Sequence, residues 1–365
     1  MKALWYHLLD PEREAVRWDW IGSPAELRCY SIRIAPVPPA AAALIRQEAA
    51  ALGITAGSLK SEHGAGKVES SGLEILLQGT EQALEKLSKI LTLSDKKAAA
   101  CGKSIRGLLK RARRRPPRVL QLGRHRLPLG ARTLIMGILN VTPDSFTDGG
   151  KFNCLSAAVE RAFQMVEEGA DIVDIGGEST RPGYRGISEA AEIARVMPVI
   201  EALKSRSDFS APLSIDTYKA ATARAALECG VEMVNDIWGL KADPDLAAVT
   251  ASFGVPICLM HNRNSTTYRE LVPEVILELQ ESIDLAKAAG ISDDHIIIDP
   301  GIGFGKDLDQ NLAVMRRLED FRGLGYPLLL GTSRKSMIGK TLELPALERI
   351  EGTAATVACG IAAGA

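Results

Sequence analysis

Short apolar runs alternate with helix-like stretches from residue 133 onward, and this rhythm limits the possible folds more than any other feature of the chain. Stretches such as Ala157–Glu168 and Leu271–Ala289 are amphipathic and would form crossover helices between the runs. Strands that are buried on both faces of a parallel sheet are apolar at nearly every position. Seven runs have this composition: TLIMGILNV, DIVDIGG, PLSIDT, EMVNDI, PICLM, HIIIDP and PLLLGTS.

Seven sequential strand–helix units favour a (β/α)8 TIM barrel. A doubly wound sheet is the alternative, but no GxGxxG motif follows the first strand. Polar side chains stand at the carboxyl end of nearly every run: Asn140, Glu178, Ser179, Asp216, Asn235, Asp236, His261, Asp299 and Ser333 to Lys335. Helix capping explains one or two such residues, but not a polar residue at almost every strand end. All carboxyl ends of a parallel barrel meet on one face, so we expect the functional site there.

The chain has 365 residues, which predicts two domains. The pattern of residues 1–109 predicts a small α+β domain of unknown role, with strands at 27–36 and 73–80 and helices at 40–52 and 81–93. Residues 110–121 contain six basic side chains, five of which precede the two prolines at 116 and 117. We interpret them as a linker, with an anion or RNA patch as the alternative. Residues 122–365 would form the barrel.

The composition excludes several classes of protein. The formal net charge is −1, which argues against binding of nucleic acid by bulk electrostatics. No apolar stretch is long enough to cross a membrane, and residues 1–12 lack the apolar core of a signal peptide. The six cysteines form no CxxC pair, which fits reduced thiols. We therefore expect a cytoplasmic protein with no nucleic-acid or membrane partner.

The motifs of residues 122–365 resemble those of dihydropteroate synthases, in the order and spacing of that family. The matching segments are MGILNVTPDSFTDGG (136–150), DIVDIGGESTRPG (171–183), SIDTYK (214–219), VNDI (234–237), IIIDPGIGFGK (296–306), GTSRK (331–335) and ERIEGTAA (348–355). The resemblance implies a transferase of folate biosynthesis. Such an enzyme joins 6-hydroxymethyl-7,8-dihydropterin pyrophosphate to p-aminobenzoate, giving 7,8-dihydropteroate and pyrophosphate.

The resemblance also assigns roles around the pterin ring. Asp299 would accept hydrogen bonds from the guanidine-like edge of the pterin. Asp216 and Asn235 would meet other heteroatoms, and Asp216 would also stabilise a pterin carbocation. Lys335 would donate to the pterin carbonyl and ring nitrogen, and Met260 would form an apolar floor.

The remaining implied roles concern pyrophosphate and p-aminobenzoate. Asn140 resembles the family's magnesium ligand, so Mg2+ is the expected cofactor. Thr180 and Arg181 lie in a loop that would close over the substrates, and Arg181 would act with Asp216 and Lys335 in catalysis. Phe304 and Ser333 would be walls of the p-aminobenzoate slot, where sulfonamides would compete.

The sequence departs from the family pattern at one point. In the family an eighth strand, carrying an R-x-H motif that binds pyrophosphate, follows the helix expected at 347–361; neither this strand nor its helix is present in these 365 residues. We expect the sequence to be a piece of a longer protein, which would be a homodimer. The alternative is a natural remnant without activity.

Two further alternatives remain for the function. A methyltetrahydrofolate methyltransferase would share acidic and amide contacts to a pterin, but it does not need the STRPG and SRK motifs. A non-catalytic pterin-binding scaffold would fit the missing strand and the unexplained first domain.

Overall fold

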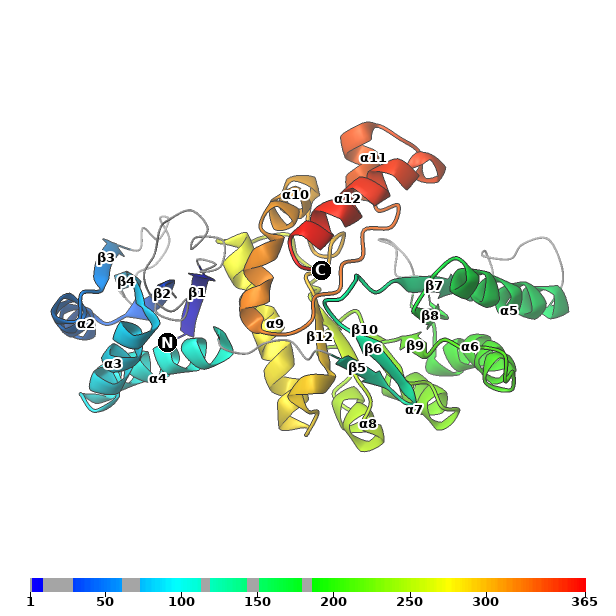
Figure 1. The fold of residues 1–365 in the computed structure, drawn as a ribbon, viewed down its shortest axis with the longest axis horizontal. Coiled ribbons are helices and arrows are strands. Elements are labelled where there is room, and N and C mark those ends of the chain that lie inside the picture. The colour runs from blue at the N-terminus through cyan, green and yellow to red at the C-terminus, as the bar shows by residue number, and fades with distance from the viewer. Residues whose placement is uncertain (1, 9–28, 61–72, 113–118, 143–150, 179–185) are drawn as a thin grey trace. The chain divides into compact units, whose positions relative to one another are not determined.

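A computed structural model describes residues 2–8, 29–60, 73–112, 119–142, 151–178 and 186–365 (Figure 1). The chain divides into two compact units: Met1–Arg115 with Glu319–Gly325, and Pro116–Leu318 with Tyr326–Ala365. Each unit has its own core, and each is described separately below.

The first unit is a four-stranded antiparallel sheet with helices. Its elements are β1 (Lys2–Leu8), β2 (Cys29–Val37), α2 (Pro39–Ala51), β3 (Thr55–Lys60), β4 (Leu73–Thr80), α3 (Glu81–Thr92) and α4 (Lys96–Ala112), and the strand order is β1-β2-β4-β3. Alternate residues of β2 and β4, including Ile32, Ile34, Ile75 and Leu77, are buried in one core with the helices. The predicted elements of this domain are present, whereas β1, β3 and α4 were not predicted.

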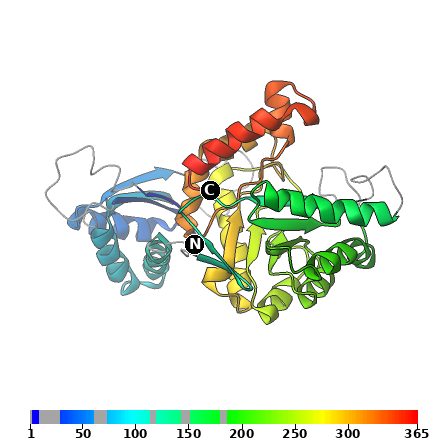
Figure 2. The ribbon, with the colours of Figure 1, turned by 45° about the vertical axis from the view of Figure 1, so that its right-hand side comes forward.

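The second unit contains a six-stranded parallel sheet with the order β12-β11-β10-β9-β8-β7. Helices follow the strands along the chain, and Figures 1 and 2 show α5 to α9 outside the curved sheet. The strands are β7 (Met136–Asn140), β8 (Ile172–Gly176), β9 (Leu213–Asp216), β10 (Met233–Asp236), β11 (Ile257–Met260) and β12 (Ile296–Asp299). The helices are α5 (Lys151–Glu167), α6 (Glu189–Lys204), α7 (Ala220–Glu228), α8 (Leu246–Phe253), α9 (Leu271–Ala288), α10 (Leu308–Arg316), α11 (Ser336–Leu342) and α12 (Ile350–Ala362).

The seventh strand predicted from the sequence is not a regular strand in the structure. Its run, PLLLGTS, meets β12 only through a single parallel bridge between Ile298 and Leu328. Two backbone hydrogen bonds support the bridge, from Ile298 N to Pro327 O at 3.0 Å and from Leu329 N to Ile298 O at 2.8 Å. The segment therefore extends the sheet by a single bridge and is not a regular strand.

The start of the second unit also differs from the prediction. Helix α4 continues to Ala112, and an unpredicted hairpin of β5 (Val119–Leu122) and β6 (His125–Pro128) begins at Val119. The predicted linker of 110–121 therefore overlaps both elements. Leu120 and Leu122 of the hairpin are buried in a cluster with Ile172, Met233, Cys258 and Ile297, which face the interior of the sheet. The hairpin thus covers the interior beside the amino-terminal half of the strands.

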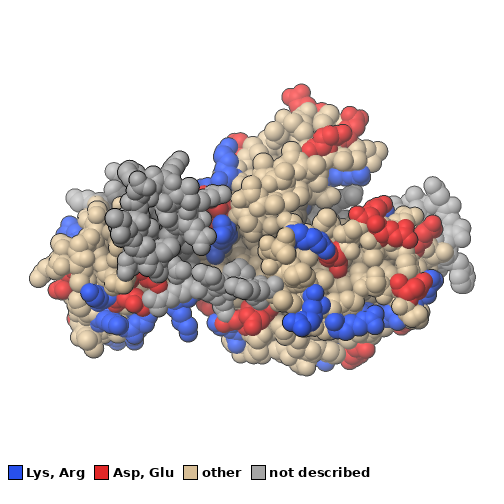
Figure 3. All heavy atoms as spheres, viewed as in Figure 1, with Lys and Arg blue, Asp and Glu red and all other residues tan. Residues whose placement is uncertain are grey.

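The described residues also include three short 3-10 helices, at Asp293–His295, Leu318–Leu324 and Ala346–Glu348. No helix in the described ranges is long and apolar enough to cross a membrane. Basic and acidic side chains are interspersed on the face seen in Figure 3, in keeping with the near-neutral net charge.

Candidate functional site

The parallel register brings the predicted polar residues to one edge of the sheet. Asn140 of β7 pairs with Gly176 of β8, which pairs with Asp216 of β9, and Asp216 pairs with Asn235 of β10. These positions form one continuous row across four strands. Met260 pairs with Asp299 at the ends of β11 and β12. The cluster of polar strand ends expected from the sequence is therefore present.

Lys335 directly precedes α11, and its side chain extends to this edge of the sheet. Its ammonium donates to the carbonyl of Ile302 and lies 4.8 Å from the centre of the Phe304 ring. A Cβ placed on Gly331 would be 3.6 Å from Lys335 Nζ and 3.9 Å from Asp299 Oδ2, so both groups border the same small space. The ammonium of Lys335 therefore lies beside the carboxyl group of Asp299 at this edge of the sheet.

Burial controls the protonation of this cluster. It raises the pKa of Asp216 well above its ordinary value, with the neighbouring carboxylates Asp174 and Glu192 adding to the shift and Lys335 opposing it. Burial likewise raises the pKa of Asp299, again opposed by Lys335. Burial lowers the pKa of Lys335, and the negative charges of Asp299 and Asp216 oppose this shift. Asp216 Oδ1 is buried and has no hydrogen-bond partner among the described residues, so it is free to accept from a ligand.

The other predicted site residues lie around this cluster, with two exceptions. Asn140 is exposed at the end of β7, Met260 is buried, Phe304 is partly buried in the loop after β12, and Ser333 is exposed. A Cβ placed on Gly176 would be 3.6 Å from Asn140 Oδ1 and 3.4 Å from Asp216 Oδ2, which places the two side chains together. Thr180 and Arg181 lie outside the described residues.

The loop that carries Phe304 is held by three glycines and a buried lysine. Gly301, Gly303 and Gly305 all have positive φ, at 69°, 87° and 56°. Lys306 is 8% exposed, and its ammonium donates to Gly301 O at 2.9 Å and to Phe304 O at 3.0 Å. The loop geometry is therefore determined by contacts within the protein.

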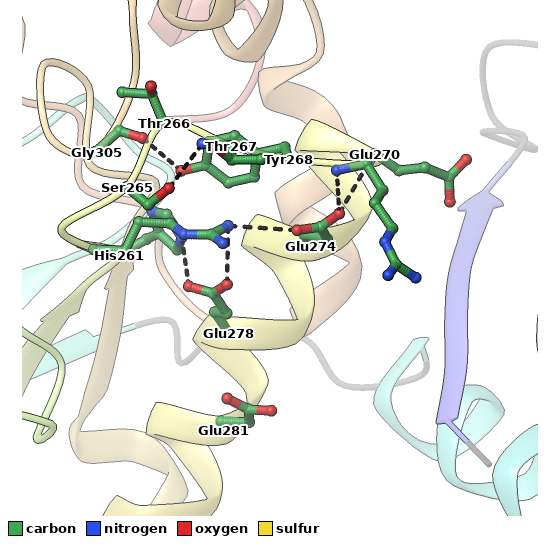
Figure 4. A network of polar contacts seen from close by, with 12 residues as sticks. His261, Ser265, Thr266, Thr267, Tyr268, Glu270, Glu274, Glu278, Glu281 and Gly305 are labelled. Carbon is green, nitrogen blue, oxygen red and sulfur yellow. Dashed lines mark hydrogen bonds and ion pairs between the residues drawn. The ribbon is translucent and has the colours of Figure 1, made fainter. Parts of the chain in front are cut away.

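A polar network extends from this loop to α9 (Figure 4). His261 follows β11 and lies 3.0 Å from Glu278, while Tyr268 donates to Gly305 O at 2.7 Å. Glu274 accepts from the backbone of Arg269 and Glu270, at 2.7 and 2.9 Å. Burial lowers the pKa of His261 to about 4, so the imidazole is neutral near pH 7. These contacts give His261 a structural role in linking the end of β11 to α9.

Three of the buried charged residues that the sequence argument missed lie close to this site. Asp174 lies inside β8 and accepts from Asn235 Nδ2 at 2.8 Å. Lys219 is paired with Glu178 and with Glu192 at 2.8 Å, beside the start of the loop that carries Thr180. Lys306 is the third. Only Asp174 could have been found from the sequence. It is an acidic residue within an apolar run, and because it lies two positions before Gly176 it is on the same, inward face of the strand.

The donor set determines which metal could bind. The described residues contain no group of three His, Cys, Asp or Glu side chains able to hold a metal ion. Asn140 offers a single exposed amide oxygen at the edge of the cluster. One hard oxygen ligand fits a magnesium ion that is held mainly by substrate phosphates, and it does not fit a structural zinc site.

Comparisons with known proteins agree with this geometry. Residues 136–365 match the family model described as pterin binding enzyme. A dihydropteroate synthase of Clostridium beijerinckii is 56% identical over 242 residues, covering 66% of this chain and 89% of the relative.

Solved structures give the same result. A dihydropteroate synthase of Clostridium difficile, crystallised in the presence of pteroic acid, is 50% identical with a TM-score of 0.63, covering 65% of this chain and 89% of that one. The enzyme of Xanthomonas albilineans with 4-aminobenzoic acid is 40% identical with a TM-score of 0.65, covering 68% and 90%.

Proposed function

The chain belongs to the pterin binding enzyme family, whose model matches residues 136–365, and it is similar to dihydropteroate synthases. We propose that the row of polar strand ends in this chain carries out the reaction of those enzymes. This function is the condensation of 6-hydroxymethyl-7,8-dihydropterin pyrophosphate with p-aminobenzoate. Its products are 7,8-dihydropteroate and pyrophosphate. The observation that carries the proposal is the gathering of buried Asp299 with the partly buried Asp216, Asn235 and Lys335 at one sheet edge.

The pterin binds against the carboxyl ends of β9 to β12. Asp299 accepts two hydrogen bonds from the guanidine-like edge of the ring, and the neighbouring Lys335 donates to the ring carbonyl and nitrogen. Asp216 and Asn235 meet the remaining heteroatoms, and Met260 lies under the ring. Burial supports these roles, because a hydrogen bond to a charged group is strengthened away from water.

The reaction breaks the bond between the exocyclic methylene carbon and oxygen, and pyrophosphate leaves with the electron pair. The aniline nitrogen of p-aminobenzoate then attacks the carbon and loses a proton. The developing positive charge favours the ionised form of Asp216, whose pKa is raised while the pocket is empty. The interaction with Asp216 is therefore stronger in the transition state than in the ground state, which is the condition for catalysis.

Magnesium supplies charge neutralisation to the leaving pyrophosphate when it is bound. Asn140 would hold the ion through its amide oxygen at the edge of the cluster. Thr180 and Arg181, which lie outside the described residues, are proposed to contact the substrates. Phe304 and Ser333 line the slot for p-aminobenzoate.

Two properties of the whole protein are part of the proposal. It acts in the cytoplasm, in keeping with the absence of a membrane-spanning helix from the described ranges. It forms a homodimer, and exposed apolar side chains on α12 support this, among them Val357 at 38% and Ile361 at 46% exposure. Sedimentation of the purified protein tests the dimer.

Calorimetry of the pterin substrate tests the location of the site. The wild-type protein should bind 6-hydroxymethyl-7,8-dihydropterin pyrophosphate in the presence of Mg2+, and Asp299→Ala should remove the binding. Asp309→Ala, at an exposed position on α10, is the matched control and should bind like the wild type. Equal affinity of Asp299→Ala and the control would exclude Asp299 from the pocket.

A further inference from the structure

Asp174 is a buried carboxyl that the proposed reaction does not use. It lies in the middle of β8 and is 4% exposed. The salt bridges within the described part of the chain do not include it. Interior positions of a parallel barrel are normally filled by branched apolar side chains, and a buried polar group without compensation is costly. Its presence at this position therefore calls for a specific role.

The register places Asp174 directly beneath the candidate pterin pocket. Asp174 pairs with Ser214 of β9, and two residues further along each strand Gly176 pairs with Asp216 at the pocket edge. Ile172, on the same inward face, belongs to the apolar cluster with Met233. Asp174 thus lies between the apolar cluster of Ile172 and Met233 and the row of polar strand ends.

The one side-chain amide of that row within reach of Asp174 belongs to Asn235. Asn235 Nδ2 donates to Asp174 Oδ2 over 2.8 Å. An asparagine amide has one donor end and one acceptor end. With Nδ2 directed down to Asp174, Oδ1 is left for the pocket. Oδ2 of Asp174 accepts this bond when the carboxyl is ionised, and also when it is protonated on Oδ1.

We propose that Asp174 is a positioning residue that fixes the amide of Asn235 with its acceptor toward the ligand, so that this position of the pocket recognises an N–H donor of the pterin. The inference rests on the proposed function, because it takes the ligand to be a pterin. Asp174 itself does not touch the ligand. Without it the amide of Asn235 can rotate, and it can then present either end to the pocket.

Substitutions at Asp174 separate positioning from packing. Asp174→Leu keeps the branched shape of the side chain but removes the acceptor, whereas Asp174→Asn keeps an oxygen that can accept from Asn235 Nδ2. Asp174→Leu should weaken the binding of pteroic acid about tenfold, the effect of one lost buried hydrogen bond, and Asp174→Asn should bind within about threefold of the wild type. Met233→Leu, a volume-conserving change in the adjacent apolar layer, is the packing control and should leave the affinity unchanged.

A double-mutant cycle with Asn235 provides the decisive measurement, by calorimetry with pteroic acid. If Asp174 acts through Asn235, adding Asp174→Leu to Asn235→Ala should cause no further loss of affinity. Full additivity of the two effects, or unchanged affinity of Asp174→Leu, would overturn the positioning role while leaving the proposed function intact.

Two controls distinguish a folding defect from a loss of binding. Thermal unfolding is measured for each variant, and if Asp174→Leu does not fold, the Asp174→Asn variant decides: a tenfold weakening there would contradict the proposal. Failure of the wild-type protein to bind pteroic acid would overturn both the positioning role and the proposed function.

Discussion

The ammonium of Lys306 lies 2.9 Å from Nδ1 of His261, and both side chains are buried. Because the carboxylate of Glu278 can only accept, Nε2 of His261 carries the proton and donates to it at 3.0 Å, and Nδ1 is left to accept from Lys306. The imidazole is therefore a neutral bridge between the loop that carries Phe304 and helix α9. Protonation of Nδ1 would place two positive charges in contact.

Acidification should destabilise the protein through His261. Its pKa is lowered to about 4 in the folded state, mainly by burial, from 6.5. Between these values the unfolded chain binds the proton and the folded chain does not, so the free energy of unfolding falls as the pH is lowered from 6.5 to 4. The loss amounts to about 3 kcal/mol.

Urea unfolding at a series of pH values measures this slope. His261→Gln should flatten it, even if the variant is less stable at pH 7. His295→Gln serves as the control and should retain the slope. An unchanged slope in His261→Gln would assign the acid sensitivity to another group.

Gly301→Ala should be far more damaging than an ordinary substitution at a glycine of positive φ. A Cβ at this position would lie 1.9 Å from His261 O, whereas a Cβ on Gly290, which also has positive φ, meets nothing within 4 Å. Gly290→Ala should cost about 1 kcal/mol of stability from backbone strain alone. Gly301→Ala carries the additional clash, so it should have the lower unfolding midpoint and lose pterin binding. Similar midpoints for the two variants would show that the loop can shift to accept the Cβ.

The hairpin of β5 and β6 should contribute stability but not substrate contacts. Leu122 is fully buried in the cluster with Met233 and Ile297. Leu122→Ala should lower the free energy of unfolding by about 2–5 kcal/mol. Leu347→Ala, at a side chain that is 78% exposed, should change it by less than about 0.5 kcal/mol. The folded fraction of Leu122→Ala should keep its pterin affinity, and a selective loss of affinity would place the hairpin in the site.

Sulfonamides should compete with p-aminobenzoate. They imitate its ring and amine, so they should occupy the slot beside Phe304 and Ser333. Steady-state rates should show a sulfonamide raising the KM for p-aminobenzoate while kcat stays constant. A fall in kcat at saturating p-aminobenzoate would mean that the inhibitor binds elsewhere.

The sequence predicted the barrel and its polar face because both follow from local patterns. Alternation of apolar runs with helices determines a parallel sheet, and parallel strands must place Asp216 and Asn235 at the same edge. The short strand β3, TAGSLK, carries little apolar signal, and it is held in place by pairing with β4. Lys306 could not be placed in advance either, because its partners come from the distant His261 and from backbone carbonyls of a folded loop.

Asp174 illustrates the same limit within a strand. Its inward direction could be deduced from the period of two, but its partnership with Asn235 spans 61 positions in the sequence. Only the register of three adjacent strands brings the two side chains together. Contacts of this kind depend on tertiary structure rather than on local propensity.

The production of 7,8-dihydropteroate and pyrophosphate is the most direct test of the central claim. The full-length protein, supplied with 6-hydroxymethyl-7,8-dihydropterin pyrophosphate, p-aminobenzoate and Mg2+, should form the two products in equal amounts. Lys335→Met should reduce the rate strongly, and Lys340→Met, at an exposed position on α11, should match the wild type. Absence of dihydropteroate from the wild-type reaction would contradict the assignment of this chain as a dihydropteroate synthase.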